Sequence, residues 1–242
     1  MNILKRIFGF ASSGVSDQLP APPKVPTSSE PGPDASSFIN AKDWLKAASE
    51  RDFVWSDLGE LALPSRAIFV GDPTGGHDYH MRASTGLEVD SVRVWVFESG
   101  PEGSEFEAHT NTLLWLEVLG TPPVTRDSSL DFGVDAACLA FGDLETGNAF
   151  TRLSDLEYDA GRGDNFEWLL PHIQEKPHFA RWVDIPPDAH RMFIASTGND
   201  GGFAAVWLHD VQDEISGILI DIGGRASDLR FLDKLLPQRS ES

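Results

Sequence analysis

The chain is poor in the features that mark several classes of protein. It has one cysteine in 242 residues, so no internal disulfide can form and nothing indicates a cross-linked secreted scaffold. No apolar run reaches the roughly 18 residues of a membrane-spanning helix, which predicts no stable membrane insertion. Basic residues are scarce, because 19 Lys and Arg stand against 38 Asp and Glu. Phosphate contacts need clustered cations, so we expect no nucleic-acid partner.

What the chain does contain predicts a folded domain. Fifteen Phe, seven Trp and 40% hydrophobic residues exclude a disordered acidic polymer. With one cysteine and no secretory signal, we expect the protein to be cytoplasmic.

The first 37 residues differ from the rest. Six prolines between residues 20 and 33 predict an extended linker, because proline removes backbone donors and disfavours helix in the preceding residue. Residues 1–10 place apolar side chains at helical spacing, which suits either a frayed leader or a transient membrane or partner contact. We therefore divide the chain into a leader and linker (1–37), one acidic β-rich domain (38–237) and a tail (238–242). Charges in 1–37 cancel, so the net charge of −19 belongs to the remainder.

Hydrophobic periodicity predicts a mainly β domain. A helix capped by Ser37 is expected over 38–50, and a closing helix over about 228–236. Between residues 146 and 176 the pattern suits short helices or a covering loop. Strands are expected at 66–70, 91–97, 112–119, 132–141, 191–195, 203–208 and 215–222. This order favours an antiparallel sandwich or a partly open barrel with a few peripheral helices, an α+β arrangement.

No catalytic or metal signature is present. His77 and His80 are spaced for a metal clip only on a helix, and the glycines and proline before them disfavour one. Cys138 lies inside an apolar run and is expected in the core. Neither a nucleophile elbow nor a phosphate-binding glycine loop occurs. We expect no catalytic residue, metal or cofactor.

Carboxylates are the most abundant functional groups. Asp135 and Asp221 interrupt apolar strands, which predicts half-buried structural roles, and Arg225 is a local partner for Asp221. If instead Asp135, Asp143 and Asp200 converge in one pocket, they would support a carboxylate- or metal-dependent hydrolase.

Three loops are candidate binding segments, at residues 77–79, 199–202 and 210–214. Residues 197–202 have the composition of a tight hairpin turn, which either needs no ligand or presents backbone N–H groups to an anion or a partner. The candidate binding residues are His77, Asp78, Tyr79, Asn199, Asp200, Gly201, Gly202, Asp210, Asp213 and Glu214.

Three segments resemble a bacterial family catalogued as domain of unknown function 4241. They are Leu63-Pro64-Ser65 through Gly71-Asp72-Pro73, then Val134-Asp135-Ala136 through Cys138 to Asp143, and Gly198-Asn199-Asp200-Gly201-Gly202-Phe203 with Val206-Trp207 and Asp221. The chain departs from the family's pattern at Arg66, Asn199 and Phe203. The resemblance covers residues 55–222 and implies a mostly β bacterial domain without an established activity.

These observations favour a non-enzymatic cytoplasmic binding protein over the hydrolase. Its charge would attract a basic protein partner, as a bacterial toxin-immunity protein attracts a basic toxin. A third hypothesis is an envelope-associated accessory protein held by residues 1–10.

Overall fold

The structure is a computed structural model of the whole chain. The chain divides into two units, Met1–Pro31 and Gly32–Ser242, close to the expected boundary at residue 37. The described residues all belong to the second unit and are 38, 40–48, 54–73, 82–85, 87–99, 110–135, 137–163, 165–173, 181–188, 190–197, 200–222 and 230–239.

Strands dominate the described part of the chain. The helices are α2 (Ala41–Ala48), α3 (Leu144–Asp159), α4 (Asn165–Ile173) and α5 (Arg230–Leu235). The strands are β1 (Val54–Ala62), β2 (Ala67–Gly71), β3 (Arg82–Thr85), β4 (Ser91–Ser99), β5 (Thr110–Glu117), β6 (Thr125–Arg126), β7 (Leu130–Val134), β8 (Cys138–Asp143), β9 (Arg181–Ile185), β10 (His190–Ser196), β11 (Gly201–His209) and β12 (Ile215–Asp221).

The strands form two antiparallel sheets. The larger has the order β1-β4-β5-β12-β11-β6, with β7 also pairing with β11 further along the same edge. The smaller has the order β3-β2-β8-β10-β9. The sheets pack face to face, and one buried cluster takes side chains from both, so the predicted mainly β sandwich is confirmed.

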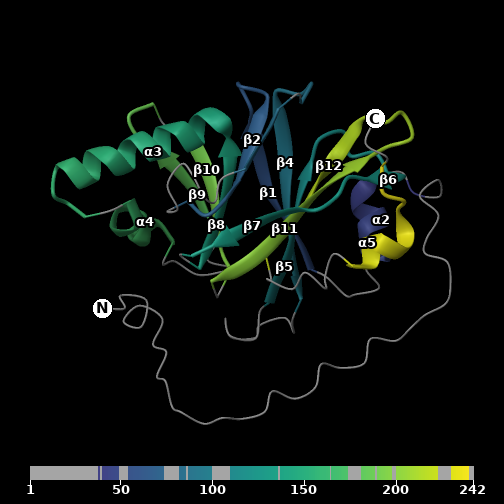
Figure 1. Cartoon of the computed structure of the whole chain (residues 1–242). Helices are drawn as coiled ribbons and strands as arrows, with labels where there is room; N and C mark the ends of the chain where they lie inside the picture. Colours follow the sequence, from purple (N-terminus) through teal and green to yellow (C-terminus); the bar gives the residue numbers. More distant parts are fainter. Residues whose placement is uncertain are drawn as a thin grey trace, which may run out of the picture. The chain divides into compact units, whose positions relative to one another are not determined.

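Helices cover the outer face of each sheet, which gives four layers (Figure 1). Helices α2 and α5 pack on the larger sheet around Trp115, and α3 and α4 pack on the smaller sheet around Phe150. Strand β5 shows why its sequence is continuously apolar: Leu114 and Leu116 face the other sheet, whereas Leu113 and Trp115 face the helices.

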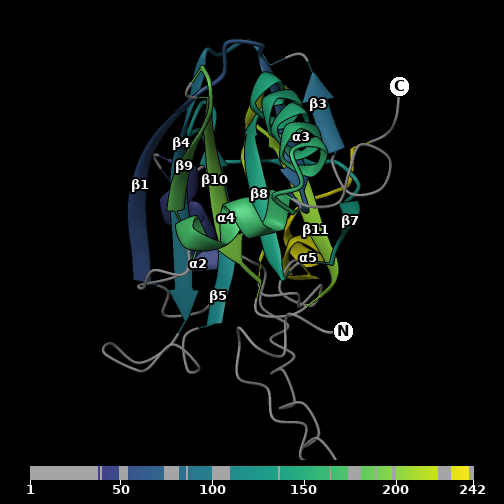
Figure 2. The same ribbon diagram turned by 90° about the vertical axis from the view of Figure 1, so that its left-hand side faces the viewer.

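The open side of the sandwich is closed where two edge strands approach each other. Trp182 of β9 donates its indole N–H to the carbonyl of Leu58 in β1, at 2.8 Å. Figure 2 shows β1 and β9 on this side. This bond joins the two sheets at their edge strands.

Several features differ from those expected, and β1, β3, β6 and β9 lie where no strand was predicted. Residues 132–141 form two strands in different sheets, and the segment 197–200 crosses from β10 to β11 in the other sheet instead of closing a hairpin. The first helix begins at Ala41 because Asn40, not Ser37, accepts the N–H of Asp43. The expected tail also enters the fold, since Gln238 bridges to Arg126.

Candidate functional site

Two crossovers between the sheets meet at one end of β8. The first joins β7 to β8 and contains Ala137, whose φ of +50° is unusual for a residue with a side chain. The second joins β10 to β11. They are fastened together because the Ala137 N–H donates to Oδ1 of Asp200 and the Thr197 N–H donates to the Ala137 carbonyl, both at 3.0 Å.

A third segment reaches the same place from β2. Asp72, which is fully buried, accepts the N–H of Asp135 at 2.5 Å. Three segments that are more than 60 residues apart in sequence therefore meet around the start of β8, through the carboxylates of Asp72 and Asp200 and the backbone N–H of Asp135.

The Cys138 thiol lies near Asp72 and Asp200. The thiol is 2% exposed, as expected for a core residue. Burial raises the pKa of the Cys138 thiol above its ordinary range, and the charges of Asp72 and Asp200 raise that pKa further. The thiol therefore stays protonated and packs as a small apolar group instead of acting as a nucleophile.

We expect Cys138 to give the protein a stability that is lost in alkali. Because the folded-state pKa is raised, the contribution is complete below the unfolded pKa of about 8.5 and falls above it by up to about 1.4 kcal/mol per pH unit. The measurement is urea unfolding of wild type and Cys138→Ala at pH 8 to 10.5. Equal slopes for the two proteins would show that the thiol ionises as readily in the fold as outside it.

The outward carboxylates of this region lie on the larger sheet. Asp135 follows β7 and is exposed, so the expected half-buried position was wrong: the strand ends at Val134, one residue earlier. Asp200 is also exposed and immediately precedes the residue paired with Val134. Asp131, on the same strand as Val134, is exposed too. These three side chains add negative charge to one stretch of surface.

Within the acidic loop 210–214, the structure gives Asp210 a structural role. Asp210 is 3% exposed and accepts the N–H groups of Gln212 and Glu214 and the hydroxyl of Thr121. Asp213 pairs with Arg239 at 2.7 Å. Among the predicted binding residues of this loop, Glu214 alone is exposed without a described ion pair.

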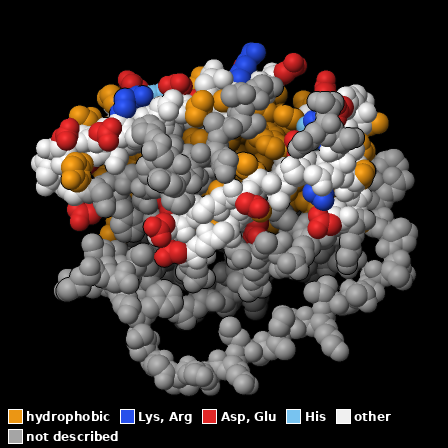
Figure 3. Space-filling view, in the orientation of Figure 1, with side chains coloured by type: hydrophobic (Ala, Val, Ile, Leu, Met, Phe, Trp, Pro, Cys, Tyr) orange, Lys and Arg blue, Asp and Glu red, His pale blue; other side chains and the backbone are white. Residues whose placement is uncertain are grey.

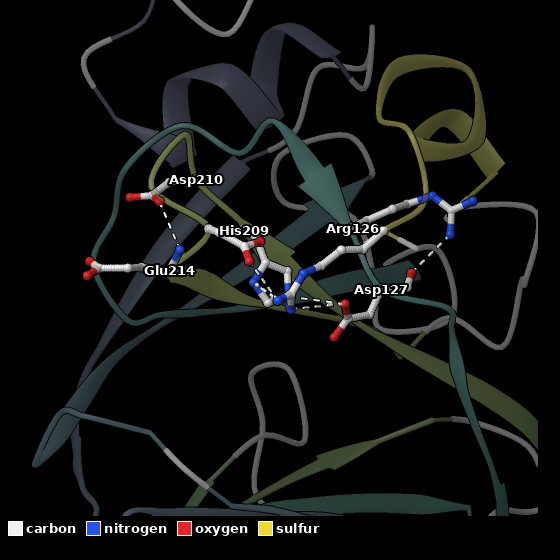
Figure 4. Close-up of polar contacts among 7 residues, drawn as sticks. Arg126, Asp127, His209, Asp210 and Glu214 are labelled. Atoms are coloured by element: carbon white, nitrogen blue, oxygen red, sulfur yellow. Dashed lines mark hydrogen bonds and ion pairs between the residues drawn. The ribbon is translucent and has the colours of Figure 1, made fainter. Parts of the chain in front are cut away.

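A buried histidine beside this loop was not expected from the sequence (Figure 4). His209 has Nε2 3.2 Å from Oδ1 of Asp127, and Nη1 of Arg239 lies 3.3 Å and 3.5 Å from the two ring nitrogens. Among the described residues no hydroxyl or thiol donates to this ring. The arrangement therefore fastens the segment around Arg239 onto the sheet and does not form a catalytic triad.

The residues proposed for a hydrolase do not converge. Asp143 ends β8 and accepts both the N–H and the hydroxyl of Ser65, whereas Asp200 lies at the beginning of that strand. A six-residue strand separates them by about 17–20 Å. Nor do any three His, Cys, Asp or Glu side chains gather as a metal site within the described ranges.

The remaining predicted residues are divided between the described and undescribed parts. Asp221 is fully buried at the end of β12, and Gly201 and Gly202 begin β11. His77, Asp78, Tyr79, Asn199 and Arg225 lie outside the described residues. None of the helices described here combines the length and apolar character needed to span a bilayer.

Comparisons with family models, with curated proteins and with solved structures found no match to this chain. The family resemblance therefore stays a prediction. The motifs that carry it do meet in space: Ser65 bonds Asp143 at one end of β8, and Asp72 and Asp200 lie at the other.

Proposed function

We propose that this chain is a non-enzymatic binding protein whose acidic surface recruits a basic protein partner. The observation that carries the proposal is a group of exposed carboxylates along the paired strands β7 and β11. Asp131, Asp135 and Asp200 have no cationic partner among the described residues. Several other outward carboxylates are paired, in Asp57–Arg93, Asp90–Arg66, Asp184–Arg191 and Asp213–Arg239. Glu60, Glu88, Asp155 and Asp159 are also exposed without an ion pair among the described residues, whereas Asp131, Asp135 and Asp200 are brought together by the pairing of β7 with β11.

The roles of the other polar groups support binding over catalysis. Asp72, Asp143 and Asp210 are buried and accept hydrogen bonds from the backbone, so they hold loops in place. The net charge of −19 creates a field that speeds encounter with a cation, and the exposed carboxylates give that field a local focus. A narrower form of the proposal is a bacterial immunity protein that captures a basic toxin in the cytoplasm.

The test compares two variants of equal net charge. Asp131→Asn, Asp135→Asn and Asp200→Asn combined remove three charges at the proposed surface. Glu145→Gln, Asp155→Asn and Asp159→Asn combined remove three from exposed positions on α3. Each immobilised full-length protein is exposed to an extract of the organism that encodes the chain, and retained proteins are identified by mass spectrometry.

We expect wild type and the α3 variant to retain the same basic protein, and the first variant to lose most of it. Retention should fall between about 0.05 M and 0.5 M salt, because screening shortens the range of these charges. Equal retention by both variants, insensitivity to salt, or recovery of no basic protein would contradict the proposal.

A further inference from the structure

Strand β7 presents an edge that no described strand covers. It pairs with β11 through five residues, from Leu130 opposite Ala205 to Val134 opposite Gly201. The neighbouring β6 is protected, because Arg126 donates its N–H to Pro237 and accepts the N–H of Arg239. We call the side of residues 130–134 that faces away from β11 the β7 edge. Alternate residues of such an edge direct their N–H and carbonyl groups outward.

The two faces of this edge differ in chemistry. Leu130, Phe132 and Val134 point toward the core between the sheets, and Leu130 is only partly buried there. Asp131 and the Gly133 position are on the opposite, outer face, and the exposed Asp135 comes directly after the strand. Gly133 is paired with Gly202, so no side chain overhangs the outer face at that position. Figure 3 shows acidic groups over the region of β7 and β11, below a gathering of hydrophobic side chains.

The negative charge beside the β7 edge favours a partner strand with cationic side chains. A second copy pairing antiparallel through β7 in the register centred on Gly133 would place Asp131 of one molecule opposite Asp135 of the other, and like charges in facing positions are destabilising. A strand with cationic side chains on that face avoids this repulsion. On the other face, every second side chain would meet Leu130 and the margin of the core, where apolar residues are favoured.

We propose that the β7 edge binds, as an added strand, an extended partner segment in which Lys or Arg alternates with apolar residues. The inference rests on the proposed function and names its binding mode. Main-chain hydrogen bonds give such a complex its affinity, and the alternation of side chains gives its specificity.

The probe is a seven-residue peptide of alternating arginine and valine, acetylated and amidated, with binding measured by fluorescence anisotropy on the full chain. One control is the same peptide N-methylated at every internal amide, which keeps the charge and removes the N–H donors. Another has the same composition with arginines and valines in separate blocks. Amide hydrogen exchange locates the contact.

We expect each control peptide to bind at least about tenfold more weakly, since it loses either the ladder or the alternation. Exchange should slow at residues 130–134. Asp131→Asn with Asp135→Asn should weaken the alternating peptide about tenfold, and Asp155→Asn with Asp159→Asn should change binding less than twofold.

Several results would overturn the inference. Equal binding of the methylated peptide, or protection elsewhere, would leave recruitment by charge intact and exclude strand addition. If the peptide does not bind but a basic partner is still retained from the extract, strand addition is likewise excluded and recruitment by charge is left intact. If both experiments fail, the proposed function is contradicted as well. Tighter binding of a peptide of residues 1–10, or a dimer in light scattering, would assign the edge to the chain's own leader or to a second copy.

Discussion

Asp143→Ala is expected to lower the free energy of unfolding by about 3 kcal/mol, because one buried carboxylate joins three parts of the fold. Its Oδ2 accepts the N–H of Ser65 at 2.9 Å and the hydroxyl of the same residue at 2.7 Å. Its Oδ1 accepts the N–H of Glu145 and caps α3. The side chain is 2% exposed, so water does not replace these bonds when the acceptor is removed.

Two milder substitutions separate the contributions. Asp143→Asn keeps an oxygen for the cap of α3 but turns an amide N–H₂ toward the N–H of Ser65, so about half of the loss is expected. Ser65→Ala removes the hydroxyl, which donates to Asp143 at 2.7 Å and lies 3.4 Å from the carbonyl oxygen of Ala67, and should cost roughly 1 kcal/mol. Urea unfolding followed by circular dichroism provides the measurement. A loss below about 1 kcal/mol for Asp143→Ala would show that this carboxylate does not hold β8, α3 and the turn before β2 together.

The strands that follow simple periodicity were predictable from the sequence. Val92, Val94 and Val96 alternate with polar or aromatic residues, and all three are buried between the sheets. The break between β7 and β8 was not predictable, because Ala137 carries no glycine or proline signal. It adopts its left-handed conformation beside the carboxylate of Asp200, 63 residues away. The local sequence pattern indicates where a strand lies, but not to which of the two sheets that strand belongs.

The candidate site shows the same limit of sequence reasoning. Turn composition at residues 197–202 is equally compatible with a hairpin and with a crossover between sheets, and only the pairing of β11 with β7 and β12 decides between them. The sequence around Asp210 is typical of a solvated loop, yet its side chain is buried and accepts a hydrogen bond from the backbone of its own turn. His209 gains its role from Asp127 and Arg239, which are distant in sequence and give no motif spacing.

Gly217→Ala is expected to reduce stability by at least about 3 kcal/mol, a larger cost than overpacking usually brings. Gly217 lies in β12 diagonally opposite Trp115 of β5, whose ring is fully buried beneath α2 and α5. A β-carbon there would enter the Trp115 ring and lie 2.5 Å from the carbonyl oxygen of Leu116. The ring is enclosed and the carbonyl belongs to the backbone, so β12 must move away from β5.

The matched control is Gly202→Ala in β11, where an added β-carbon meets nothing within 4 Å. That substitution should be neutral or stabilise the protein by up to about 1 kcal/mol, because alanine restricts the unfolded chain. Thermal or urea unfolding compares the two. Adding Trp115→Leu to Gly217→Ala should recover only part of the loss, since the contact with the Leu116 carbonyl remains. Equal stability of the two glycine variants would mean that the ring does not rest on Gly217, and the packing of α2 and α5 on this sheet would need a different explanation.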